Sequence, residues 1–204
     1  MPIENSQGDQ TSLPPDLRAI IDELDRTDQQ ARLLVAGLSE TQLNWQPGGG
    51  TGWSVAQCLE HLAQSTALYA PALLEAVRKA KASPAPAHKP IRPGWLGRWF
   101  INELEPPPKR KLKSPKKARP TAQLKGAEVL NSFLAGHDQV RALIEEARDL
   151  DLNRIRFRNP FLRLLPWTVG TGLMVIGAHD RRHLWQAEQV IKAMEQGAPA
   201  TKAH

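Results

Sequence analysis

The sequence has 204 residues with 41% hydrophobic and 24% charged residues, fractions that are ordinary for a soluble globular protein. Its single cysteine excludes an internal disulfide framework and cysteine-rich zinc sites, and no apolar run reaches the roughly 18 residues of a membrane span. The N-terminal residues lack a basic region followed by an apolar stretch, so we expect no secretory signal and a cytoplasmic location.

The formal charge of +6 comes from one segment, residues 109–119, which carries seven cations and no anion. The rest of the chain is therefore close to neutral, at −1. One functional hypothesis is a binding protein that uses its basic loop, residues 109–119, to engage an acidic partner or nucleic acid. Nucleic acid is the less favoured partner, because the loop contains no aromatic side chain on which bases could stack.

The first predicted helix follows a polar tail, residues 1–12, and starts near Asp16, a candidate N-cap. Apolar residues recur at helical spacing from Leu17 to Leu38. Asp28 falls within this stripe. We expect a slightly rotated, solvated position for it, and the alternative is a partner for a buried cation.

The second predicted helix starts at Ser54, because Ser54 and Gln57 match the S-x-x-Q capping box. It should extend to about Lys81 and carry His61 about two turns from its start. Cys58 lies one turn before this histidine. A lone buried cysteine usually packs as a small hydrophobic residue, and metal ligation as a thiolate is the less favoured alternative.

A long crossover, residues 83–120, separates the second and third helices and holds nine of the seventeen prolines, so only Trp95–Leu104 can form a short helix there. The aromatic residues of this short helix should cover the bundle or fill a dimer contact, with docking to a membrane surface as the alternative. Helical spacing resumes at Thr121 and continues to Ala147. His137 lies on its apolar face, where a core histidine is expected more often than a metal ligand.

The fourth predicted helix spans Thr168 to Gln196 and ends in a stop signal at residues 197–199. His179 and His183 lie one turn apart in its apolar seam, so both imidazoles can reach a single ion. With His61 they predict three neutral nitrogen ligands and an open coordination position, the arrangement of a catalytic site. Residues within a turn of these histidines are candidates for orienting them or a substrate: Gln57, Asp180 and Gln186.

Several motifs resemble the DinB-like (YfiT-type) proteins, in particular their DinB_2 branch. The resemblance extends from about Asp16 to Met194. Its matching parts are Leu38–Pro47, Trp53–Gln57 with His61-Leu62, the prolines of the crossover at 106–108, 115 and 120, and His179–Leu184 with Gln186.

This resemblance implies an all-α fold, a four-helix bundle in up-down-down-up order. We expect this single domain to span residues 13–197, with flexible tails at 1–12 and 198–204. The long proline-rich crossover agrees, because two parallel neighbouring helices need a connection that returns along the bundle. The resemblance also implies that His61, His179 and His183 bind a divalent metal, commonly nickel or zinc, and that the protein is a homodimer. The expected function is a metal-dependent thiol S-transferase, using a low-molecular-weight thiol, or a hydrolase-like enzyme, acting on a small molecule that the sequence does not define.

Overall fold

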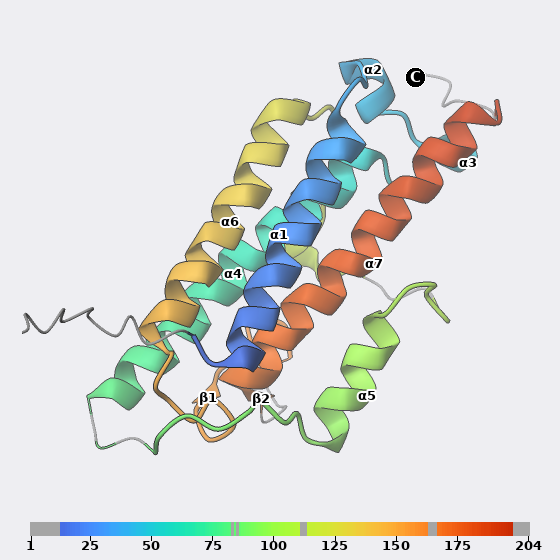
Figure 1. The fold of residues 1–204 in the computed structure, drawn as a ribbon. Coiled ribbons are helices and arrows are strands. Elements are labelled where there is room, and N and C mark those ends of the chain that lie inside the picture. Colours follow the sequence, from blue (N-terminus) through green and yellow to red (C-terminus); the bar gives the residue numbers. More distant parts are fainter. Residues whose placement is uncertain (1–12, 83, 85, 111–113, 163–166, 198–204) are drawn as a thin grey trace, which may run out of the picture.

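Four long helices pack side by side as a bundle in the computed structural model of the protein (Figure 1). The structure describes residues 13–82, 84, 86–110, 114–162 and 167–197. The predicted tails, 1–12 and 198–204, lie outside these ranges. The elements are α1 (Pro15–Val35), α2 (Glu40–Leu43), α3 (Pro47–Gly50), α4 (Val55–Lys81), α5 (Trp95–Leu104), η1 (Lys116–Ala118), α6 (Gly126–Glu146), β1 (Arg156–Phe157), β2 (Trp167–Thr168) and α7 (Val169–Glu195).

The directions of the long helices confirm the predicted up-down-down-up order. In Figure 1, α1 and α7 run upward and α4 and α6 run downward, so the neighbouring helices α4 and α6 are parallel. The segment between them includes α5 and η1, which contact α7 and α4 respectively. The two strands form one short antiparallel ladder that precedes α7.

Local capping explains where the helices begin. Ser54 and Gln57 form the predicted capping box of α4, and the Thr168 hydroxyl caps α7. Asp16 is not the N-cap of α1, contrary to the prediction, because Pro14 holds that position. The Asp16 carboxylate instead accepts hydrogen bonds from the His88 ring and the Ile91 amide, which holds the crossover against α1.

The third long helix begins at Gly126, five residues later than Thr121, where the sequence predicted it to start. The Asn44 side chain donates a hydrogen bond to the carbonyl oxygen of Leu124 and accepts one from the amide of Leu124. The Glu40 carboxylate accepts from the amide of Gly126. These contacts hold the segment before Gly126 against the α2 region, and helical geometry starts where they end.

A layer of polar side chains divides the core halfway along the bundle. One apolar cluster includes Leu24, Leu73 and Leu143, and a second includes Leu34, Leu59, Phe133 and Leu184. Polar or charged residues from all four long helices lie buried between them: Thr27, His61, Ser65, Thr66, His137, Asp180, Arg182 and His183. The candidate functional residues are concentrated in this layer.

Candidate metal centre

Three histidines from α4 and α7 meet in the polar layer. Nitrogen atoms of His61, His179 and His183 all lie within 4.8 Å of one another, and the Nε2 atoms of His61 and His179 are 3.1 Å apart. Zinc–nitrogen bonds of about 2.0–2.1 Å in tetrahedral geometry place two donors about 3.4 Å apart. The spacing of these nitrogens therefore fits a single divalent ion.

Hydrogen bonds to the opposite ring nitrogens orient two of the histidines. Nδ1 of His61 lies 2.5 Å from the carbonyl oxygen of Ala118, and Nδ1 of His183 lies 3.0 Å from Oε1 of Gln186. Both partners are acceptors, so each Nδ1 carries the proton and each Nε2 keeps its lone pair for a metal. The role predicted for Gln186 is thus consistent with its position.

The site favours neutral imidazoles. Burial lowers the pKa of His183 to about 3, with the charge of His61 acting in the same direction. Burial also lowers the pKa of His179 well below its usual range, and the two neighbouring histidines lower it further. Trp53 stacks on His183 with ring centroids 5.5 Å apart, which limits access of water from that side. Neutral imidazole is the form that ligates a metal.

The histidines form one wall of a cavity of 280 Å³. Its remaining surface is mainly apolar, and its polar members are Ser65, Thr66, Tyr69, Ser114, Asn159 and Arg182. No aspartate or glutamate is among the described residues that line it. Small-molecule pockets commonly have this character, an apolar wall with a few convergent polar groups.

The crossover covers this cavity and is fastened to α7 by two arginines. The guanidinium of Arg182 donates to the carbonyl oxygens of Glu103 and Arg110, each at 2.9 Å. Arg181 pairs with Glu105 on the crossover and with Glu23 on α1. Neither arginine was predicted from sequence, although both lie inside the histidine motif.

The fold and this site were compared with known proteins. A family model described as the DinB superfamily matches residues 23–187. The chain belongs to the DinB superfamily. Its fold is similar to that of YfiT from Bacillus subtilis, described as a probable metal-dependent hydrolase with an unusual four-helix bundle topology, with a TM-score of 0.56, 19% identity and 93% of each chain covered. A search of the curated proteins gave no significant match.

Two other predicted residues of this DinB-superfamily chain have structural roles. The Gln57 amide accepts from the Ser54 backbone and donates to the carbonyl oxygen of Thr121, and it has no bond to the histidines among the described contacts. Cys58 is fully buried in an apolar cluster, where burial raises the pKa of its thiol. A neutral thiol outside the histidine cluster is a core residue and not a metal ligand.

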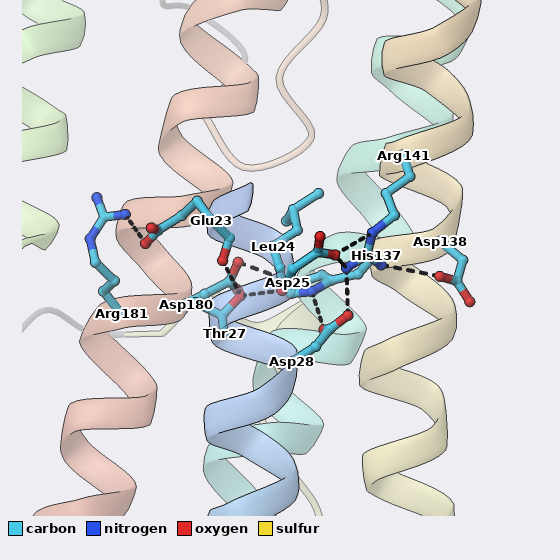
Figure 2. A network of polar contacts seen from close by, with 10 residues as sticks. All are labelled: Glu23, Leu24, Asp25, Thr27, Asp28, His137, Asp138, Arg141, Asp180 and Arg181. Carbon is cyan, nitrogen blue, oxygen red and sulfur yellow. Dashed lines mark hydrogen bonds and ion pairs between the residues drawn. The ribbon is translucent and has the colours of Figure 1, made fainter. Parts of the chain in front are cut away.

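His137 and Asp180 belong to a separate charged network between α1, α6 and α7 (Figure 2). Nδ1 of His137 lies 2.6 Å from Asp28 and Nε2 lies 3.3 Å from Asp180, so both ring nitrogens face carboxylates. His137 is therefore not a ligand of the histidine cluster, and Asp180 points away from the ligands that it was predicted to orient. The solvated position expected for Asp28 is also wrong, because its side chain is 14% exposed and pairs with His137 and Arg141.

The basic segment has mixed surroundings. Arg110 pairs with Glu103 at 2.7 Å and lies over the Trp99 ring, whereas Lys116 and Lys117 are exposed. Residues 111–113 lie outside the described part of the chain. On α5, Trp95 is 76% exposed and Trp99 48% exposed. None of the helices formed by the described residues is both long and apolar enough to cross a membrane.

Proposed function

We propose that this protein is a divalent-metal-dependent enzyme of the hydrolase type, with His61, His179 and His183 as the metal ligands. The observation that carries the proposal is the convergence of three neutral imidazoles on one wall of a cavity. The description of YfiT as a probable metal-dependent hydrolase supports the same reaction class. Nickel and zinc are the proposed metals, because both bind imidazole well.

A divalent ion held by three ligands supplies a Lewis acid that polarises a carbonyl and lowers the pKa of a coordinated water or thiol. The protein residues contribute orientation and exclusion of water. Ala118 and Gln186 fix the ring orientation of two ligands, and Trp53 covers the site from the side of α3. Because no described carboxylate lines the cavity, proton transfer in the reaction depends on the substrate, on solvent or on the hydroxyl groups there.

Metal content tests the ligand assignment. Native mass spectrometry of protein purified without chelator should show one divalent ion per chain. Replacing His183 by alanine removes one of three ligands and should lower metal occupancy by an order of magnitude or more. His88→Ala is the matched control, because His88 lies beside Asp16 and outside the cluster. Equal metal content in the two variants would contradict the proposal.

A thiol S-transferase is the alternative reaction at the same site, as the sequence resemblance implies. Turnover of activated esters and of electrophiles such as epoxides, measured with and without a low-molecular-weight thiol, separates the two reactions. Hydrolysis should proceed with metal and water alone. A strict requirement for thiol would favour the transferase, and metal-loaded protein that turns over neither class of substrate would contradict both reactions.

The proposal also covers the location of the protein, its oligomeric state and its partners. A cytoplasmic homodimer acting on a small molecule is proposed from the resemblance and from the composition of the chain. Engagement of an acidic partner or nucleic acid by the loop 109–119 is the non-enzymatic alternative. Binding of that kind should weaken steeply as salt increases, whereas binding at the cavity should not.

A further inference from the structure

We propose that Arg182 makes the cavity a binding site for small carboxylates with an apolar body. This inference deepens the proposed function, because the cavity is the substrate site of the proposed enzyme. It names the substrate class: a monoanion whose carboxylate pairs with Arg182 and whose apolar part occupies the space between α4, α5 and α7.

Arg182 carries a buried charge with no ion-pair partner among the described residues. Its side chain lines the cavity while the residue is only 7% exposed. A guanidinium has five N–H donors. Within the described chain Arg182 makes two hydrogen bonds, both to backbone carbonyl oxygens. No described carboxylate lies within 4.0 Å of it. The adjacent Arg181, in contrast, pairs with two glutamates.

The nearest described glutamates already have other partners. Glu103 is already paired with Arg110, and Glu60 accepts from the amide and hydroxyl of Thr121. The described cavity lining contains no acidic side chain. A cationic group placed beside Arg182 would be repelled, and a neutral group would leave the guanidinium without a counter-ion. A carboxylate provides the missing charge and matches the forked geometry of arginine.

The shape of the cavity defines the rest of the ligand. Seven apolar side chains of the described residues line it: Phe100, Leu104, Pro115, Phe161, Leu162, Val175 and Ile176. On α4, His61, Ser65 and Tyr69 follow one another at four-residue spacing along the same face, so the lining extends about 12 Å along the helix at 1.5 Å per residue. A volume of 280 Å³ is near the lower limit for small-molecule pockets and too small for a polymer.

Tyr69 adds a polar contact at the end of the cavity away from the histidines. Its hydroxyl oxygen accepts from Nδ2 of Asn159 at 2.7 Å, and its own hydrogen has no acceptor among the described residues. The O–H group can therefore donate to a ligand. Arg182 and Tyr69 together suit a ligand with an anionic group at one end and an apolar middle. The far end of this ligand can also carry one hydrogen-bond acceptor.

The test uses two probes of the same shape, 4-phenylbutanoate and the uncharged 4-phenylbutanamide, titrated calorimetrically into metal-loaded and chelator-treated protein. In the chelator-treated protein, where no metal can bind the carboxylate, wild-type protein should bind the carboxylate at least tenfold more tightly than the amide. Arg182→Gln should abolish this preference. The control Arg98→Gln removes an exposed cation of α5 that does not line the cavity, and it should keep the preference.

Equal binding of the two probes by wild-type protein, no detectable binding of either, or an unchanged preference in Arg182→Gln would overturn the inference. If Arg182→Gln fails to fold, because it loses the bonds to the crossover, Arg182→Lys replaces it and should keep the charge preference while weakening carboxylate binding severalfold. The chelator-treated preparation separates this result from the proposed function. A carboxylate preference without metal binding would support the inference and contradict the proposed enzyme, and metal binding without the preference would do the reverse.

Discussion

The charge network around His137 makes the stability of the protein depend on pH in a defined window. The His137 side chain has no exposed surface, and it lies between Asp28 and Asp180 (Figure 2). Burial alone would lower the pKa of this imidazole, but the charges of Asp180 and Asp28 and the hydrogen bond to Asp28 outweigh burial and raise the pKa to about 9. At neutral pH the folded protein therefore holds a buried imidazolium between two aspartates.

The size of the effect follows from linkage. A rise in the pKa of His137 from 6.5 to about 9, at 1.36 kcal/mol per unit, corresponds to about 3 kcal/mol. Because the folded pKa is the higher one, this stability is complete below pH 6.5 and is lost as pH rises through about 9. The cavity histidines have lowered pKa values, so in metal-free protein they affect stability only below about pH 6.5.

Urea unfolding of chelator-treated protein, followed by circular dichroism between pH 6.5 and pH 9.5, measures this dependence. The unfolding free energy of the wild type should fall by about 3 kcal/mol across the window. The double variant His137→Leu with Asp180→Leu removes both members of one buried pair and leaves Asp28 its bond to Arg141. It should lose most of this slope and keep only a smaller one above about pH 8.5, which comes from ionisation of the Cys58 thiol in the unfolded chain, whereas His88→Gln should keep the full slope. A flat wild-type profile, or an equal slope in the double variant, would refute the reasoning.

Two further substitutions test how the site and α7 are built. Gln186→Leu removes the acceptor for Nδ1 of His183, and metal affinity measured against a competing chelator should fall about 10- to 100-fold; unchanged affinity would show that this bond does not orient the ligand. Gly172→Ala places a Cβ 2.8 Å from Leu73 and should lower the unfolding free energy by about 1–2 kcal/mol, whereas Gly177→Ala, whose nearest atom is 3.4 Å away, should not lower it. Equal melting temperatures for the two variants would contradict this packing argument.

The sequence was sufficient to predict most of the fold because its signals are local. The capping residues Ser54 and Gln57 and the terminal Gly197 act through neighbouring backbone, and α4 and α7 begin or end within a residue or two of the predicted positions. The spacing of His179 and His183 likewise needs only helix geometry. The proximity of His61 to this pair is a tertiary contact, and it could be anticipated only from the apolar seams on which all three histidines lie.

The groups that surround the histidines are brought there by contacts between segments far apart in the sequence. The spacing of apolar residues along the sequence carries no information about such contacts. The carbonyl of Ala118 orients His61 across 57 positions of sequence, and any residue type there supplies the same carbonyl. Arg182 was overlooked because a charged residue in a helix is usually solvated, and its burial results from a crossover whose path is not periodic. Asp28 was misplaced for the same reason, since its partners lie on α6.

The two histidine centres of the polar layer differ in the placement of carboxylates. The cavity cluster has no acidic neighbour among its described lining residues, so its imidazoles stay neutral and their lone pairs are available to a cation. His137 faces carboxylates on both sides and is already the cation of its network. Successive residues His179 and Asp180 project about 100° apart on α7, one toward each centre. A rotation of α7 that moved Asp180 toward the cavity would break its buried pair with His137, which would keep only Asp28, at a cost of several kcal/mol. The pairing of Asp180 with His137 therefore holds α7 in the rotation that presents His179 and His183 to His61.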